Sequence, residues 1–109
     1  MQLIPGPSKD AVFGTAQEYA DVAIAIWRMQ EEDEAAQAET AAKLQADGAP
    51  ATLPDLVDRA ADYVRRHKLG WYRRNQFFGG ILGFCMLSGM PRDDARYLVK
   101  LIRGQLKSG

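Results

Sequence analysis

Apolar residues recur at steps of three and four from residue 16 onward, which is the period of one helix face. Two neighbouring stripes follow this period: Ala16, Ala20, Ala23 and Trp27, and beside them Tyr19, Val22, Ile26 and Met29. From Gln30 to Asp47 the chain is acidic and rich in alanine and glutamine, which favour helix. Gly48 and Pro50 then stop it. The pattern predicts one long acidic helix over residues 16–47, after an extended lead-in over residues 1–15.

Three further helices are predicted in the second half, over residues 52–68, 71–88 and 91–104. The first has the clearest start, because Thr52 can cap the helix, Pro54 suits its first turn and Asp55 stands at its third position. Gly70 separates the first two, and a turn containing Gly89 separates the last two. Since no stretch predicts a strand hairpin, we expect an all-α fold: one compact four-helix domain over residues 1–109.

The predicted first helix is long for so small a protein. It would extend about 48 Å at about 1.5 Å per residue, whereas a compact chain of this length is roughly 34 Å across. Either the helix breaks near residues 31–34, or its length lies against another polypeptide. The second alternative is favoured because neither proline nor glycine occurs between Thr15 and Gly48. We therefore expect a homodimer and a heterologous protein partner.

The first helix also carries more apolar surface than one face would bury. Tryptophan and methionine are enriched in the cores of protein interfaces, which makes Trp27 and Met29 candidate contacts. The alternative, complete burial of Trp27 beneath the other helices, stays open. The predicted partner-binding residues are Tyr19, Ile24, Trp27, Met29, Trp71 and Tyr72.

The formal net charge of zero conceals two oppositely charged halves. Residues 1–62 hold four lysines and arginines against twelve acids, a net charge of −8, and residues 63–109 hold ten against two, a net charge of +8. We favour mutual packing of the halves, within one chain or across a symmetric dimer. The alternative is a nucleic-acid-binding module, in which the acidic half would have to be held away from phosphate. Its candidate contacts are Arg65, Arg66, Lys68, Arg73 and Arg74.

No arrangement of residues predicts catalysis, a cofactor or a metal site. One cysteine and one histidine cannot supply the four ligands of a structural zinc site, and Cys85 in an apolar run is expected to be a core residue. The chain lacks a nucleophile elbow, a phosphate-binding loop and a dinucleotide fingerprint. The longest uncharged stretch, residues 75–91, is shorter than the roughly 20 residues of a membrane-spanning helix. Without a cationic leader, a cytoplasmic location is expected.

Three glycines, Gly79, Gly80 and Gly83, interrupt the apolar helix predicted over residues 71–88. Each costs a helix about 1 kcal/mol relative to alanine, so the cluster predicts the close approach of another backbone, most simply a helix crossing within the domain.

The acidic helix that contains Tyr19-Ala20-Asp21-Val22-Ala23-Ile24-Ala25-Ile26-Trp27, joined to a basic helical half without a catalytic motif, resembles the QslA-type antiactivators of bacterial quorum sensing. The likeness is one of size and layout over the whole chain. It implies a homodimer that binds the ligand-binding domain of a LuxR-type transcription activator and blocks its dimerisation and DNA binding. A chaperone-like secretion or plasmid accessory protein, which would bind a disordered segment, is a further alternative.

Overall fold

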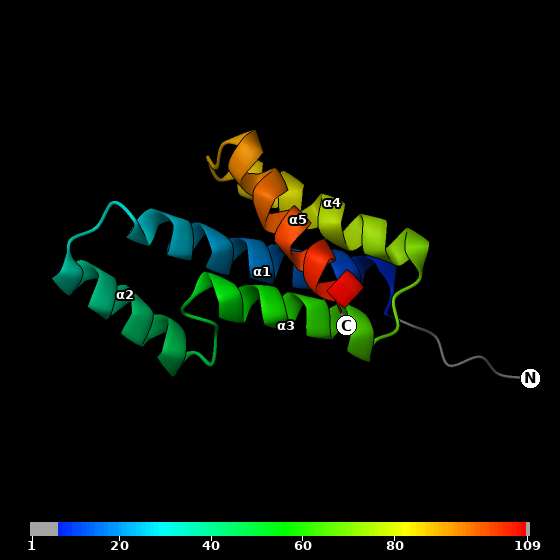
Figure 1. The fold of residues 1–109 in the computed structure, drawn as a ribbon, viewed down its shortest axis with the longest axis horizontal. Helices are drawn as coiled ribbons and strands as arrows, with labels where there is room; N and C mark the ends of the chain where they lie inside the picture. Colours follow the sequence, from blue (N-terminus) through cyan, green and yellow to red (C-terminus); the bar gives the residue numbers. More distant parts are fainter. Residues whose placement is uncertain (1–6, 109) are drawn as a thin grey trace, which may run out of the picture.

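The fold is all-α, as expected from the sequence. A computed structural model describes residues 7–108, and no strand occurs within this range. Its helices are α1 (Lys9–Met29), α2 (Glu34–Ala46), α3 (Leu53–Arg66), α4 (Trp71–Leu87) and α5 (Arg92–Ser108). Figure 1 shows α1, α3 and α4 along the long axis, with α2 at one end. The described chain thus has five helices where the sequence predicts four.

The long helix predicted over residues 16–47 is wrong, because the chain turns at residues 30–33. The Asp33 carboxylate accepts a hydrogen bond from the Ala36 backbone N–H at 2.8 Å and so caps α2. The Gln37 amide donates to the carbonyl oxygens of Met29, at 2.8 Å, and Glu32, at 3.0 Å. These side chains satisfy the backbone groups that a continuous helix would pair internally. Since α2 folds back, the length mismatch no longer argues for a partner.

The extended lead-in over residues 1–15 is wrong for residues 9–15, where α1 has already begun. Ser8 caps this helix, since its hydroxyl accepts a hydrogen bond from the Ala11 backbone N–H at 3.1 Å. Val12 is fully buried one turn later, and its burial helps to extend the helix through Gly14. Residues 1–6 of the predicted lead-in lie outside the described residues. At the other end, α5 continues past Gly104 to Ser108.

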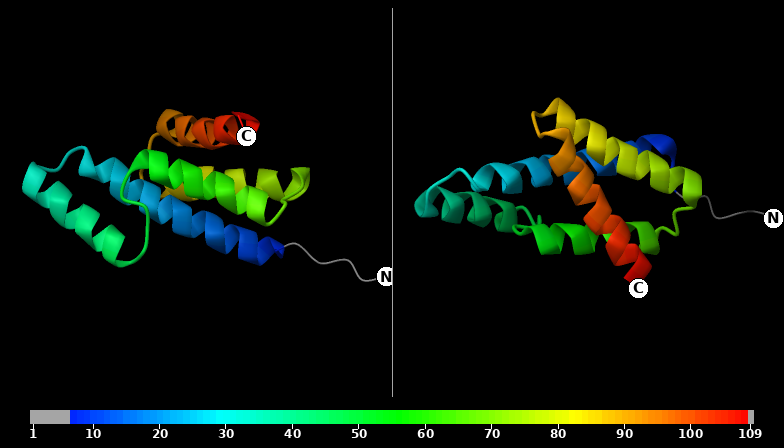
Figure 2. Two further views of the ribbon diagram at one scale, coloured as in Figure 1. Left: turned by 60° about the horizontal axis from the view of Figure 1, so that its bottom comes forward. Right: turned by 45° about the horizontal axis from the view of Figure 1, so that its top comes forward.

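The core forms where α1, α3 and α4 lie side by side and α5 crosses them. The sequence colours in Figure 1 show that α1 and α4 run in one direction and α3 in the other, and Figure 2 shows α5 lying across α3 and α4. Phe77 is fully buried at the centre, with its ring centroid 5.9 Å from that of Tyr19 and 4.9 Å from that of Tyr63. The two halves of the sequence therefore pack through apolar side chains.

The glycine cluster of α4 lies at the crossing with α1, but only its middle member makes the close approach. A Cβ atom at Gly80 would stand 2.9 Å from the Ala16 Cβ and 3.1 Å from the Phe13 Cδ1. A Cβ atom at Gly79 or Gly83 would meet nothing within 4 Å. The predicted helix crossing is present, and Gly80 allows it.

Candidate interaction surfaces

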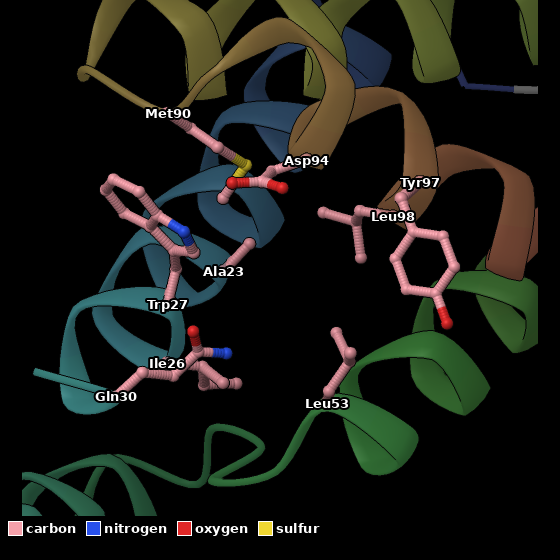
Figure 3. Close-up of a pocket in the computed structure, with 9 residues that line it drawn as sticks. All are labelled: Ala23, Ile26, Trp27, Gln30, Leu53, Met90, Asp94, Tyr97 and Leu98. Atoms are coloured by element: carbon pink, nitrogen blue, oxygen red, sulfur yellow. The ribbon is translucent and has the colours of Figure 1, made fainter.

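An apolar groove opens between the last turns of α1, the start of α3 and the first half of α5. Its deeper part is a pocket of about 280 Å³, in which the Trp27 indole and the Tyr97 ring stand on opposite sides (Figure 3). A second pocket of about 380 Å³ shares Leu53 and Tyr97 with the first and continues between α3 and α5. We call both together the Trp27 groove. It is lined by Ala23, Ile26, Trp27, Gln30, Leu53, Pro54, Val57, Asp58, Met90, Asp94, Tyr97, Leu98, Leu101 and Gln105.

The chemistry of the Trp27 groove is apolar with an acidic edge. Its charged lining residues are Asp58 and Asp94, and no lysine or arginine lines either pocket. The Tyr97 side chain is 58% exposed to solvent. Because most of its ring is apolar, this exposure leaves apolar surface uncovered in the wall of the groove. The groove can therefore accept apolar side chains from a binding partner. Its acidic edge can pair with positive charges on that partner.

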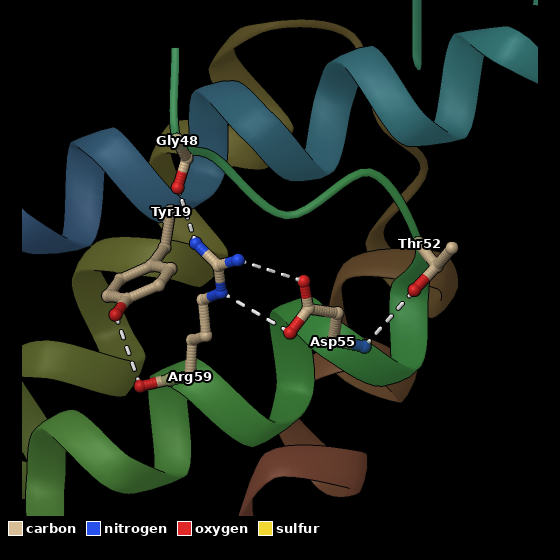
Figure 4. Close-up of polar contacts among 5 residues, drawn as sticks. All are labelled: Tyr19, Gly48, Thr52, Asp55 and Arg59. Atoms are coloured by element: carbon tan, nitrogen blue, oxygen red, sulfur yellow. Dashed lines mark hydrogen bonds and ion pairs between the residues drawn. The ribbon is translucent and has the colours of Figure 1, made fainter. Parts of the chain in front are cut away.

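Of the predicted contacts on α1, Tyr19 and Ile24 belong to the protein's own core. Ile24 is only 6% exposed, and the half-buried Tyr19 donates a hydrogen bond to the Arg59 carbonyl oxygen at 3.1 Å. Figure 4 shows this bond beside the Arg59 guanidinium, which binds the Gly48 carbonyl and the Asp55 carboxylate. These contacts hold α1, α3 and the α2–α3 connection together. Ile24 is thus buried in this fold, whereas Tyr19 keeps part of its surface exposed.

The other four predicted contacts lie at two separate places. Trp27 and Met29 are half-buried near the end of α1, and Trp27 lines the groove. Trp71 and Tyr72 begin α4 and are 78% and 63% exposed. The six residues thus do not form one interface. The groove residues on α3 and α5 were not predicted, because their contribution depends on how α5 crosses α3.

A basic end lies around the start of α4. The five predicted cations, at positions 65, 66, 68, 73 and 74, are joined there by two residues of α5, Arg103 and Lys107. The Arg65 guanidinium donates to the Gln105 carbonyl oxygen at 2.6 Å, which ties α3 to the last turns of α5. The two α5 residues were not predicted for this end, because they lie about thirty positions further along the chain.

Six of the fourteen acidic residues lie together at the opposite end of the molecule. Residues 30–47, which form the turn and α2, contain six acids and one lysine, and Figure 1 places them far from the α3–α4 connection. Each ion pair in the described part of the chain joins residues four apart in one helix: Glu39–Lys43, Asp55–Arg59 and Asp62–Arg66. The predicted packing of the two halves by mutual charge attraction within one chain therefore finds no ion pair to support it in the described residues.

Groups able to perform chemistry are sparse in the described chain. Between residues 7 and 108, no three histidine, cysteine, aspartate or glutamate side chains gather closely enough to hold a metal ion. Cys85 is fully buried, and burial, aided by Asp21, raises the pKa of its thiol to about 11. A thiol with so high a pKa is a poor nucleophile at neutral pH.

None of the helices over residues 7–108 combines the length and apolar character needed to cross a membrane. Comparison of the chain with protein-family models, with curated proteins and with solved structures found no match.

Proposed function

We propose that the protein is a non-enzymatic interaction module that binds an amphipathic helix of a partner protein in the Trp27 groove. The observation that carries the proposal is the groove itself, an apolar surface on three helices with the exposed Tyr97 ring in its wall. Helix-in-groove recognition needs such a surface, which receives anchors at positions i, i+3 or i+4, and i+7 of the partner helix.

Apolar anchors would supply most of the affinity. Full burial of one leucine-sized side chain contributes about 1.5–3 kcal/mol, so two or three anchors are sufficient for a regulated complex after the cost of association. The acidic edge at Asp94, with the neighbouring Asp93, would attract a partner helix that carries lysine or arginine beside its apolar stripe. The preferred ligand is therefore a cationic amphipathic helix.

In a regulatory setting, the protein would inhibit its partner by covering a surface that the partner needs. The resemblance to QslA-type antiactivators supplies one specific form of this proposal: a homodimer that binds the ligand-binding domain of a LuxR-type activator and blocks its dimerisation. What supports this form is the size and helical layout of the chain, in addition to the groove.

The groove is tested with a synthetic helical peptide of leucine and lysine, titrated into the isotope-labelled protein and followed by NMR. We expect the changes in chemical shift to concentrate in the last turns of α1 and the first turns of α3, which face α5. Tyr97→Ala should weaken binding about tenfold, as expected for loss of one buried anchor. Tyr72→Ala is the matched control, since it removes a similarly exposed ring at the other end. Shifts spread over α2, or equal affinity of the two variants, would contradict the proposal.

The specific form is tested by mixing the protein with a purified LuxR-type ligand-binding domain and measuring the mass of each species by light scattering. Co-elution and loss of the activator dimer are expected, together with a dimeric mass for the free protein. Absence of a complex would reject the antiactivator role, and the peptide experiment would still decide whether the groove binds a helix.

A further inference from the structure

A second cleft, separate from the Trp27 groove, lies between the first turns of α4 and the last turns of α5. Its volume is about 190 Å³, and it is lined by Trp71, Arg74, Asn75, Phe78, Arg103 and Leu106. Phe78 is 4% exposed and belongs to the core, whereas Trp71 is 78% exposed. We call this the Trp71 cleft. Pockets that hold a whole drug-sized molecule are about 300–1,000 Å³, so the cleft suits one planar group of a larger ligand.

Two guanidinium groups are held at the Trp71 cleft by contacts within the protein. The Arg103 guanidinium carbon lies 4.9 Å from the centroid of the Phe78 ring, a cation–π distance. The Arg74 Nε donates a hydrogen bond to the Leu69 carbonyl oxygen at 2.9 Å. Both positive charges are therefore placed before a ligand arrives. The Asn75 amide, which also lines the cleft, offers a hydrogen-bond donor and an acceptor.

The charged residues that line the Trp71 cleft, Arg74 and Arg103, are both cations. Residues 63–74 contain five lysines and arginines, residues 103–108 contain two, and neither segment contains an acid. On α3, Asp62 pairs with Arg66 and Asp58 accepts a hydrogen bond from Gln105. Further acids, Asp10 and Glu18, lie on α1, which packs on α4. A polyanion at this end would meet a field favourable to it.

The most acidic segment of the chain, residues 30–47, lies far from such a ligand. The molecule is 56 Å long, and the acidic α2 lies at the far end (Figure 1). Exposed charges are largely screened beyond about 8 Å at physiological ionic strength. The fold therefore holds six of the twelve acids of residues 1–62 well away from the cleft, while the other six lie on α1 and α3, which pack on α4 and α5.

We propose that the Trp71 cleft binds single-stranded nucleic acid, with one base stacked on the Trp71 indole and the flanking phosphates at Arg74 and Arg103. Single-strand binding surfaces combine a cationic track with aromatic rings on which bases stack. An acidic peptide would use the cations alone and would leave the exposed indole without a role. Bases in a duplex are already stacked, so a duplex would be bound more weakly than the single strand.

The test is fluorescence anisotropy of a labelled short oligothymidylate and its RNA counterpart, with the full-length chain at low salt. We expect binding whose affinity falls as salt rises, with a logarithmic slope of about −0.7 for each phosphate contact. Trp71→Ala should weaken binding about tenfold, the effect of losing one stacked base. Arg74→Gln and Arg103→Gln should each reduce the salt slope by about 0.7. Lys43→Gln, which removes an exposed cation at the acidic end, should change neither quantity.

Stacking has its own signal, because the chain contains two tryptophans. In a Trp27→Phe background Trp71 is the only tryptophan, and the oligonucleotide should quench its selectively excited fluorescence while inorganic polyphosphate should not. Equal binding of polyphosphate and oligonucleotide, with no effect of Trp71→Ala, would overturn the proposal in favour of a general polyanion surface. Absence of binding at low salt would also overturn it, and salt-sensitive self-association in the same samples would then assign the basic end to a second copy of the chain.

The two proposals fail independently. Tyr97→Ala should leave oligonucleotide binding unchanged, and Trp71→Ala should leave binding of the leucine and lysine peptide unchanged. Loss of both activities in either variant, with the helical circular dichroism retained, would contradict the assignment of two separate sites.

Discussion

Gly80 is the residue at which the packing of α1 against α4 is most sensitive to size. Replacing it with alanine puts a methyl group 2.9 Å from the Ala16 Cβ, so the two helices must move apart. Overpacking of this kind costs typically about 1–3 kcal/mol, which exceeds the gain of about 1 kcal/mol from better helix propensity. We expect Gly80→Ala to lower the free energy of unfolding, measured by urea denaturation.

The neighbouring glycines provide the control. A methyl group at Gly79 or Gly83 meets no atom within 4 Å, so Gly79→Ala and Gly83→Ala should each raise the free energy of unfolding by about 0.5–1 kcal/mol. A stabilising effect of Gly80→Ala, or a destabilising effect at both control positions, would show that the α1–α4 contact is not as close as described.

Single residues also show where sequence reasoning reached its limit. The exposure of Trp71 and Tyr72 agrees with their placement at the start of a helix after Gly70. Ile24 and Tyr19 were expected to face a partner because α1 is apolar on several sides. The fold covers those sides with α3 and α4. The number of helices that cover α1 depends on the tertiary arrangement. The periodicity of apolar residues in one segment carries no information about that arrangement.

At the scale of elements, α2 differs from the other helices because it contributes no buried residue. Polar contacts attach it, among them the Gln37 amide bonds and a 3.2 Å bond from the Thr40 hydroxyl to the Glu32 carboxylate. Since little apolar surface would be exposed by its opening, α2 should unfold locally at a lower free energy than the core. Hydrogen exchange followed by mass spectrometry should find residues 38–46 exchanging well before residues 20–28 of α1.

A glycine substitution separates local from global opening of α2. Ala38 is exposed, and Ala38→Gly costs a helix about 1 kcal/mol. If α2 opens by itself, this variant should exchange faster in α2 and keep the melting temperature of the whole protein. Equal exchange in α1 and α2, or a drop in melting temperature by several degrees, would place α2 in the cooperative core.

The break between α1 and α2 shows why one element was missed. Glycine and proline are the strongest signals of a helix end, and neither occurs there. The available signal was Asp33, a preferred capping residue, immediately before a run without large apolar side chains. Glutamates on both sides hid it, because a run of acids also suits an exposed helix. The break itself depends on Gln37 reaching Met29, a contact that exists only once the chain has turned.

At the scale of the whole molecule, the sequence shows an acidic and a basic half, and the fold determines where in space their charges lie. The division at residue 62 could be read as two surfaces that neutralise each other. Instead, the turn and α2 carry acids to one end, while the α3–α4 connection and the last turns of α5 gather cations at the other. The two sequence halves pack mainly through apolar side chains, as where Phe77 of α4 packs on Tyr19 of α1, and no ion pair joins them in the described part of the chain. The result is a neutral molecule with two charged ends.

Two charged ends predict weak head-to-tail association that depends on salt. Screening extends over about 30 Å at 10 mM ionic strength and about 8 Å at 150 mM, so the acidic end of one molecule should attract the basic end of the next only at low salt. Sedimentation velocity should show association at about 10 mM that disappears by about 150 mM.

Two double variants test this end-to-end association. Arg73→Glu with Arg74→Glu should abolish it, since both charges lie at the basic end. Arg92→Glu with Arg96→Glu changes the net charge equally outside that end and should preserve it. Low-salt association that the first pair of substitutions leaves unchanged would contradict end-to-end attraction. A dimer that also survives high salt would instead be the homodimer expected of an antiactivator, joined through an apolar interface such as the Trp27 groove.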